Sequence, residues 1–141
     1  MPASATSVAD VGAGDGQLAS YLRARGLKVI ATERRPGPYA RLNAALPELD
    51  CRQGEGLEVL RPGEVQGVVL AGFGGHTIAR VLESSPAVAR TLEWMVLQPQ
   101  QHVGHLLAWL DSAGYRVEGR ATTSQGRHSY TVLLVRPDER P

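Results

Sequence analysis

The chain has 141 residues, of which 43% are hydrophobic and 21% are charged, and its formal net charge is +1. This composition favours neither a disordered nor a membrane protein, and the balanced charge gives no overall basic surface for nucleic acid. The length suits one domain over residues 1–141. Cys51 is the single cysteine, so the chain cannot form an internal disulfide. No apolar run is long enough for a membrane span, and the first residues lack a signal-peptide pattern, so we expect a cytoplasmic protein.

Strands and helices alternate along most of the chain. Apolar and β-branched runs predict strands, and glycine or proline marks the ends of the amphipathic helices between them. In chain order, we expect strands at 7–11, 27–32, 49–52, 65–71, 94–97, 115–121 and 129–135. The expected helices are 17–25, 36–46, a short stretch at 57–60, a helix opened by residues 72–75 that continues to 82, and 102–113.

The order of these elements predicts the fold class. Strands that alternate with helices form a mainly parallel sheet with helices on both faces. The last two strands are separated by the polar and glycine residues 122–128, which predict a loop and an antiparallel pair. The sequence therefore predicts an α/β protein with a seven-stranded, mainly parallel sheet and an antiparallel final strand.

A glycine-rich turn follows the first predicted strand. Glycines at this position let the backbone turn sharply into a helix and let a ligand approach closely. A dinucleotide site would need a further glycine at Gln17, so an NAD-type site is disfavoured, and the flanking carboxylates suit a zwitterionic ligand with an ammonium group. The alternative is a structural turn without a ligand. The expected ligand contacts are Asp10, Gly12, Gly14, Asp15, Gly16, Gln17 and Leu18.

Acidic residues follow the next two predicted strands. Glu33 lies about twenty residues beyond the glycine turn, where a carboxylate can accept hydrogen bonds from both hydroxyls of a ribose. Its neighbour Arg34 is a further expected contact, although an ion pair between Glu33 and Arg34 or Arg35 is the alternative. The turn of Gly54, Glu55 and Gly56 reaches the same edge of the sheet, and an ordinary turn is equally compatible with it.

The next two strand ends should border a second ligand, because open α/β sheets bind ligands at the carboxyl ends of their strands. Ala71 and Gly72 are expected to contact the nucleotide-like ligand as well. The aromatic ring of Phe73 could stack on a base or fill the core. The expected contacts of the second ligand are Phe73, Gly74, Gly75 and Pro99.

Several of these motifs together resemble one family. They are Glu33 with Gly37-Pro38-Tyr39, RQGEGL from Arg52, AGFGG from Ala71, Leu97-Gln98-Pro99, and Ala108-Trp109-Leu110 with Gly114-Tyr115. The chain is similar, over most of residues 8–135, to the bacterial tRNA adenine-N1 methyltransferases that act at position 22 of tRNA. The resemblance implies S-adenosyl-L-methionine as methyl donor, tRNA as partner, N1 of an adenine as acceptor, and a Rossmann-like domain. It also implies that Glu55 lies near the adenine ring of the cofactor.

The chain departs from that family in three places. Gly14-Asp15 stands where the family usually has a D-H pair, and Gln100 stands where Leu-Gln-Pro is usually followed by Asn. The family also has a helical segment before the first strand and a long helical C-terminal extension, so we expect a shortened member. Two alternatives stay open: a methyltransferase with a small-molecule or protein acceptor, and an inactive member that binds the cofactor.

Methyl transfer to N1 of adenine requires alignment of the acceptor with the methyl group more than it requires a basic side chain. Neutral adenine has a lone pair at N1, so it can attack the sulfonium methyl without prior deprotonation. We expect the backbone carbonyls near Gly72 and the amides of Gln98 and Gln100 to orient the acceptor, although the two glutamines could merely cap elements.

The acceptor base must also leave any base pair before it reacts. Arg34, Arg35 and Arg41 are candidates for gripping phosphates, or form a solvated helix face. His76 is expected to begin a helix rather than act as a base. The remaining histidines have no metal-ligand spacing with Cys51, so we expect no metal.

Overall fold

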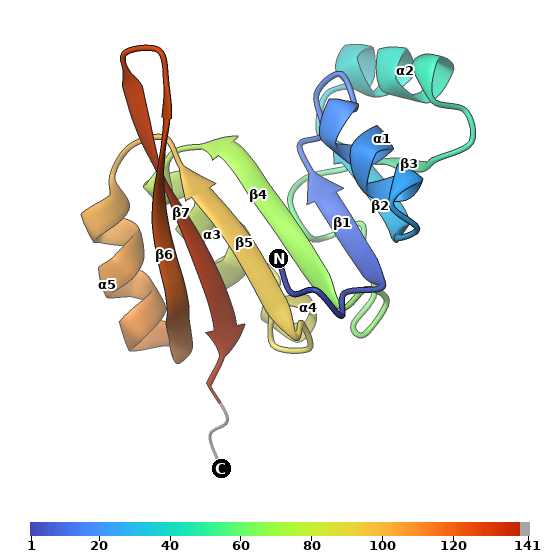
Figure 1. Ribbon diagram of the computed structural model, residues 1–141. Coiled ribbons are helices and arrows are strands. Elements are labelled where there is room, and N and C mark those ends of the chain that lie inside the picture. The colour runs from blue at the N-terminus through green and yellow to red at the C-terminus, as the bar shows by residue number, and fades with distance from the viewer. Residues whose placement is uncertain (139–141) are drawn as a thin grey trace.

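The computed structural model describes residues 1–138, apart from the side chain of Gln125, and within them the chain forms one seven-stranded sheet (Figure 1). The strand order across the sheet is β3-β2-β1-β4-β5-β7-β6. The strands are β1 (Ser7–Val11), β2 (Lys28–Glu33), β3 (Asp50–Gln53), β4 (Gly67–Phe73), β5 (Trp94–Pro99), β6 (Tyr115–Gln125) and β7 (His128–Pro137).

The first five strands are mutually parallel, and β7 runs antiparallel to both β5 and β6. The predicted fold class, including the antiparallel final strand, is therefore confirmed. The order reverses between β1 and β4, since β2 and β3 lie on one side of β1 while β4 and β5 lie on the other. Such a reversal opens a crevice at the carboxyl ends of the strands, where α/β proteins bind their ligands.

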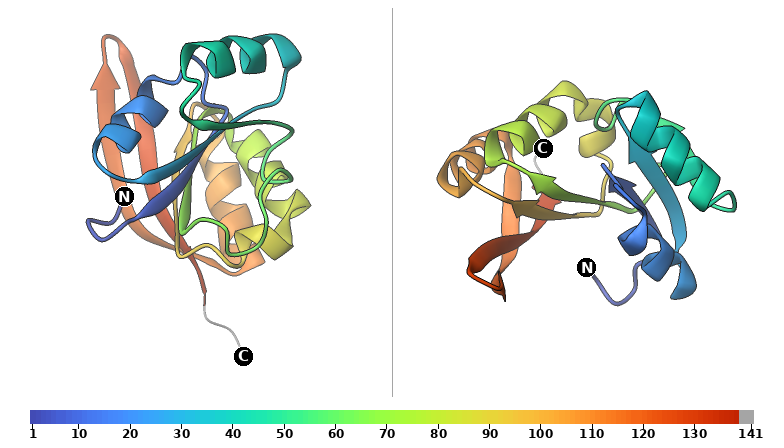
Figure 2. Two further views of the ribbon diagram at one scale, coloured as in Figure 1. Left: turned by 90° about the vertical axis from the view of Figure 1, so that its right-hand side faces the viewer. Right: turned by 90° about the horizontal axis from the view of Figure 1, so that it is seen from above.

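Helices cover both faces of the sheet (Figure 2). They are α1 (Gln17–Ala24), α2 (Pro36–Ala45), α3 (Gly75–Ser84), α4 (Pro86–Ala89) and α5 (Val103–Ala113). Because side chains alternate along a strand, Val8 of β1 packs with Leu22 of α1 and Leu42 of α2, whereas Ala9 packs with the residues of the opposite face. That opposite core includes the buried leucines of α3 and α5. No helix within residues 1–138 is long and apolar enough to span a bilayer.

The observed elements differ from the predicted ones in three places. Residues 57–60 form turns rather than a helical stretch, and only isolated turn hydrogen bonds connect them. The side chains of Leu57 and Leu60 are buried, so core packing holds this segment without a helix. Strand β4 continues through Gly72 and Phe73, so helix α3 begins only at Gly75. The short helix α4, which starts at a proline, was not predicted.

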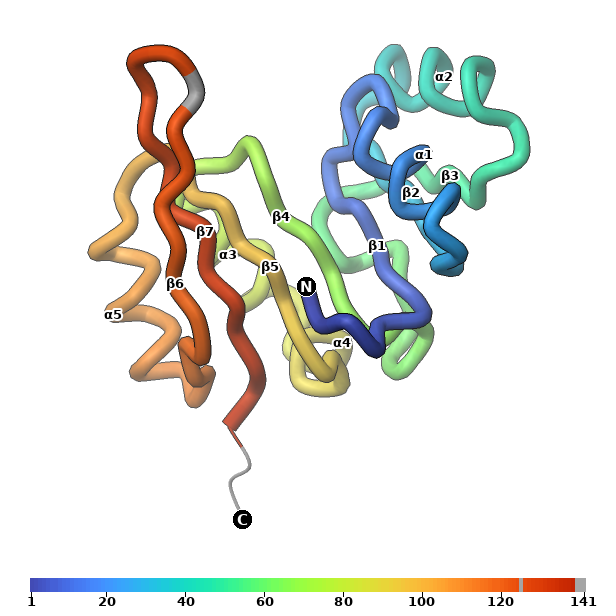
Figure 3. The backbone as a smooth tube through the Cα atoms, viewed as in Figure 1, coloured from blue at the N-terminus to red at the C-terminus, as the bar shows by residue number. Residues whose placement is uncertain are grey.

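The predicted loop at 122–128 is also wrong. Strands β6 and β7 pair through Gln125 and His128, and only Gly126 and Arg127 form the turn, with Gly126 at φ 63°. The hairpin of β6 and β7 extends past the other strands (Figure 3), and its described side chains near the turn are exposed to solvent. Polar residues are therefore tolerated there. The sequence pattern of an exposed hairpin lacks the apolar alternation by which a half-buried strand is recognised.

Candidate functional site

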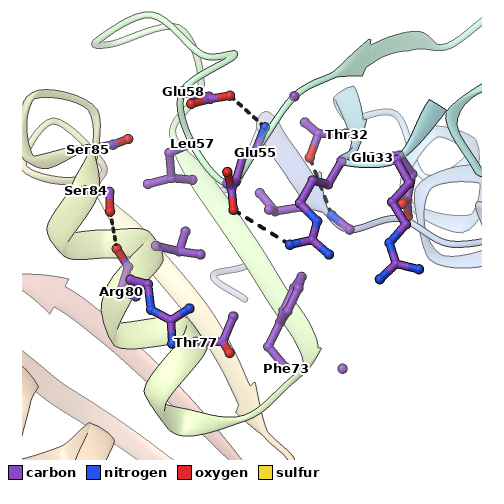
Figure 4. A pocket seen from close by; sticks show the side chains of 18 of the residues that line it. Thr32, Glu33, Glu55, Leu57, Glu58, Phe73, Thr77, Arg80, Ser84 and Ser85 are labelled. Carbon is purple, nitrogen blue, oxygen red and sulfur yellow. Dashed lines mark hydrogen bonds and ion pairs between the residues drawn. The ribbon is translucent and has the colours of Figure 1, made fainter.

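A cavity of about 800 Å³ opens at the crevice created by the reversal of strand order (Figure 4). Its walls come from the carboxyl ends of β1, β2 and β4, from the loop after β3 and from one side of α3. This volume lies within the range of about 300–1,000 Å³ typical of small-molecule sites. The cavity therefore has the place and the size of a ligand site in an α/β protein.

The glycine turn after β1 forms one end of this cavity. Gly12, Gly14 and Gly16 all have φ between 61° and 83°, in the left-handed region that favours glycine. The N–H groups of Gly12 and Ala13 donate to the carbonyl oxygen of Thr32, at 3.0 and 2.9 Å, and so tie the turn to the end of β2. Helix α1 then begins directly after Gly16.

Glu33 connects the two parts of the sequence that were expected to hold the ligand. Its Oε1 accepts a hydrogen bond of 2.5 Å from the N–H of Gly14, and its side chain lines the cavity. Its own carbonyl oxygen accepts from the N–H of Gly54, at 3.0 Å, so the turn after β3 is tied to the same residue. The carboxylate retains a second oxygen with which it can bind a hydroxyl of a ligand.

Asp10 is buried beside this carboxylate, with 4% of its surface exposed. Burial raises the pKa of the Asp10 carboxyl from 3.8 to about 6, and the negative charge of Glu33 adds to the rise. Both effects disfavour the ionised form, because the carboxylate loses water and faces a like charge. A positive group of a ligand near the two carboxylates would favour their ionised forms.

The loop after β3 forms the opposite wall. Glu55 of this loop forms an ion pair of 3.8 Å with Arg34. Both side chains are more than half exposed, so this ion pair contributes little to stability. A stronger anchor lies at the base of the loop, where the guanidinium of Arg52 bonds to Glu64 at 2.6 Å and to the carbonyl oxygen of Val59 at 2.9 Å. The sequence analysis did not assign this pairing, because the two residues are twelve apart and share no helix or strand.

The end of β4 shapes the floor of the cavity. The register between β4 and β5 shifts between Ala71 and Phe73, and Gly72 takes φ 85° at that irregularity. The ring of Phe73 lies against the glycine turn, since a Cβ added to Gly12 would be 2.6 Å from its Cζ. Phe73 both packs on the core and lines the cavity, so the two roles expected for its ring coexist.

Backbone hydrogen bonds connect the segment after β5 to the end of β4 and the start of α3. The N–H of Gln100 donates to the carbonyl oxygen of Phe73 at 2.9 Å, and the N–H of Gly75 donates to that of Gln101 at 2.7 Å. Gln98 and Pro99 belong to β5 itself. The segments expected to border a second ligand thus form one connected rim. Ala71, Gly72 and Phe73 of this rim line the cavity, whereas Gly74, Gly75 and residues 98–100 do not.

The expected site residues divide into two groups. Those that line the cavity are Gly12, Glu33, Arg34, Gly54, Glu55, Gly56, Ala71, Gly72 and Phe73. Those that lie outside its lining are Asp10, Gly14, Asp15, Gly16, Gln17, Leu18, Gly74, Gly75, Gln98, Pro99 and Gln100. Among the latter, Gly14 is bonded directly to Glu33.

One side of α3 lines the cavity and was not expected to. Its contribution is Thr77, Arg80, Val81 and Ser84. Their spacing of three and four residues places them on one face of the helix, which the sequence could have indicated. That this face turns toward the cavity is a property of the packing. Within residues 1–138, no group of three or more His, Cys, Asp or Glu has an arrangement that could hold a metal ion.

The sequence matches a family model described as "Methyltransferase domain" over residues 1–133. The tRNA (adenine(22)-N(1))-methyltransferase of Bacillus subtilis (strain 168) is 29% identical over an alignment that covers 94% of this chain and 59% of that protein. The chain thus spans about 60% of the length of this relative.

Solved structures are similar over nearly the whole chain. The B. subtilis M1A22 tRNA methyltransferase TrmK has a TM-score of 0.88 at 28% identity, with 96% of this chain and 61% of that chain covered. Streptococcus pneumoniae Sp1610, described as a putative tRNA (m1A22) methyltransferase in complex with S-adenosyl-L-methionine, has a TM-score of 0.88 at 26% identity, with coverage of 95% and 67%. Since the family model covers most of the sequence and the cavity lies at the carboxyl ends of the strands, the chain belongs to the methyltransferase domain family.

Proposed function

We propose that the chain binds S-adenosyl-L-methionine in this cavity and transfers its methyl group to N1 of an adenine in tRNA. The observation that carries the proposal is the hydrogen bond between Glu33 and Gly14, which joins a ribose-type carboxylate that lines the cavity of a methyltransferase domain to the glycine turn at its end. The family match and the tRNA-modifying relatives support the choice of cofactor and acceptor.

The residues present fit this cofactor. Glu33 would accept the ribose hydroxyls, and the turn of Gly54, Glu55 and Gly56 with the buried Leu57 would border the adenine ring. Gly12 would allow the close approach that a larger side chain would prevent, because Phe73 already occupies the space beside it. The carboxylates of Asp10 and Glu33 suit a ligand with positive groups.

When bound, the cofactor supplies a methyl group on a positively charged sulfur. The acceptor N1 uses its own lone pair to form the new bond to the methyl carbon while the bond from carbon to sulfur breaks, so the positive charge passes to the base. No side chain needs to remove a proton before this step. The contribution of the protein is then to align the two groups and exclude water between them.

The rim formed by β4 and β5 would orient the acceptor. The exocyclic amino group of adenine is a donor, and the carbonyl near Gly72 and the side-chain oxygens of Gln98 and Gln100 are acceptors. The backbone hydrogen bond between Gln100 and Phe73 keeps these groups at one place. The expected cytoplasmic location and the single domain over residues 1–141 belong to the same proposal.

Two experiments test the proposal. Calorimetric titration with S-adenosyl-L-methionine should give saturable binding to the whole chain, and absence of binding at millimolar ligand would refute the cofactor assignment. A tritium-transfer assay on unmodified tRNA, followed by nucleoside analysis, should yield 1-methyladenosine. Methylation of small-molecule or protein acceptors without that product would refute the tRNA assignment while it leaves the methyltransferase assignment standing.

A further inference from the structure

Three histidines gather at the start of α3 and α5, outside the cavity. The ring centroids of His76 and His105 are 3.9 Å apart, and those of His76 and His102 are 4.4 Å apart. All three side chains are exposed. They come from segments 26 residues or more apart in the sequence, so only the packing of α3 on α5 brings them together.

The backbone beneath this histidine cluster is tightly connected. A Cβ added to Gly75 would lie 2.2 Å from the carbonyl oxygen of His102, so the two helix starts touch at a glycine. His102 has φ 58°, and it is the only residue other than glycine with a positive φ within the described part of the chain. Uncommon backbone conformations of this kind concentrate at functional sites. The close contact at Gly75 and its hydrogen bond to Gln101 therefore fix the backbones of the two helix starts against each other.

The neighbouring groups that lower the pKa of His76 are all basic side chains. The pKa of His76 is lowered first by partial loss of water and then by His105, His102 and Arg80. Arg80 lies one turn after His76 on the same face of α3, and it also lines the cavity. His102 and His105 come from the start of α5. A phosphate placed against these side chains would favour the protonated imidazoles, because its negative charge would offset the loss of water and the basic neighbours that lower the pKa of His76.

The cluster also lies beside the rim that would orient the acceptor. His76 follows Gly74 by two residues, and His102 follows Gln100 by two. The starts of α3 and α5 both point toward this place, and the positive ends of their dipoles favour negative charge. A polynucleotide that delivers a base to this rim carries its phosphates close to it.

We propose that His76, His102 and His105 bind a phosphodiester group of the acceptor RNA next to the base that is methylated. This inference rests on the proposed function, since it names the group that holds the RNA at the same site. It assigns this phosphate contact to imidazoles rather than to Arg34, Arg35 and Arg41. A metal ion is the competing occupant, but the described residues show no arrangement that could hold one.

The test compares RNA binding at two pH values. A labelled, unmodified tRNA transcript is titrated with the protein at about pH 6 and about pH 8 at constant ionic strength, with fluorescence anisotropy as the readout. The wild-type chain should bind about tenfold more tightly at the lower pH, and the salt dependence at that pH should include about one phosphate contact from the cluster. The triple variant His76→Gln, His102→Asn, His105→Gln should lose both. Asn is chosen at residue 102 because it tolerates a positive φ.

The control is His128→Gln, which removes an exposed histidine from the β6–β7 hairpin, away from the cluster. It should keep the pH response, and all variants should keep their affinity for S-adenosyl-L-methionine within about twofold, which also reports correct folding. A triple variant that binds tRNA with the wild-type pH response and salt slope would overturn the inference. So would tRNA binding that EDTA abolishes, because the cluster would then hold a metal.

The failure of this inference differs from the failure of the proposed function. If wild-type protein methylates tRNA and the triple variant does so with unchanged KM at both pH values, only the phosphate site is wrong. If wild-type protein binds S-adenosyl-L-methionine but neither binds nor methylates tRNA, the tRNA assignment itself is wrong and the phosphate site falls with it.

Discussion

Replacement of Asp10 by Asn should make the protein more stable at neutral pH. The buried carboxyl has its pKa raised from 3.8 to about 6 by burial and by Glu33. Because the folded state binds this proton more tightly than the unfolded state, the contribution of Asp10 to stability is fully present below about pH 4. It is lost as the pH rises through about 6. A raised pKa in a buried site that faces a second carboxylate is a mark of a functional position rather than of a stabilising one.

The magnitude follows from the two pKa values. Each pKa unit corresponds to 1.36 kcal/mol, so a rise from 3.8 to about 6 is equivalent to about 3 kcal/mol of unfavourable free energy above pH 6. Asn has nearly the same shape and carries no charge. The difference in unfolding free energy between Asp10→Asn and wild type should therefore grow by up to about 3 kcal/mol between pH 4 and pH 8.

The assay is urea unfolding at several pH values, followed by the fluorescence of the buried Trp94. Asp15→Asn is the matched control, because it removes a carboxylate from the same turn at an exposed position. It gives the baseline effect of losing a negative charge there. A difference between Asp10→Asn and wild type that stays constant from pH 4 to pH 8 would refute the reasoning, because no proton would then be linked to the burial of Asp10.

Three further predictions address the site and its anchor. Glu33→Gln should weaken binding of S-adenosyl-L-methionine by about 1.5–3 kcal/mol, because a neutral amide replaces a charged acceptor, and unchanged affinity by calorimetry would remove Glu33 from the site. Gly12→Ala should destabilise the fold by about 1–3 kcal/mol, because the new Cβ would clash with the ring of Phe73 and because alanine adopts the positive φ of this position poorly. In urea unfolding, the double variant Gly12→Ala, Phe73→Leu should recover part of this loss, since the smaller side chain removes the clash. Glu64→Gln should lower the unfolding free energy by about 2 kcal/mol at pH 7, because a neutral amide replaces the charged partner of Arg52 at 2.6 Å, while Asp50 and the carbonyl oxygen of Val59 remain. In the wild-type protein the pKa of Glu64 is lowered to about 2, chiefly by the hydrogen bond from Arg52. The difference in unfolding free energy between wild type and Glu64→Gln should therefore shrink as the pH falls from about 4.5 toward 2. A difference that widens over this range would contradict the role given to the pair of Arg52 and Glu64.

Much of the candidate site could be predicted because its signals are local. The glycine turn needs positive φ at Gly12, Gly14 and Gly16, and no other residue type adopts that conformation as readily. Glu33 could be assigned from its position at the end of a strand, and that strand was recognisable from its apolar run. The misplaced segments are those whose local pattern is ambiguous, such as the polar hairpin at 122–128 and the buried turn at 57–60.

Other features of the site depend on residues far apart in the sequence. The face of α3 that lines the cavity, the contact of Phe73 with Gly12 and the bond from Arg52 to Glu64 have no local signature. Each exists because the sheet and its helices bring distant segments to one edge. The same is true of the histidine cluster, whose members lie at the start of two separate helices.

The sequence by itself determined the order of strands and helices, the mainly parallel sheet and the glycine turn beside Glu33. These follow from side-chain periodicity and from backbone preferences that act within a few residues. The tertiary structure alone decided that Asp10 is buried against a second carboxylate and that α3 and α5 meet at their starts. Burial and the approach of like charges are properties of packing, and packing is set by the whole chain rather than by any one segment.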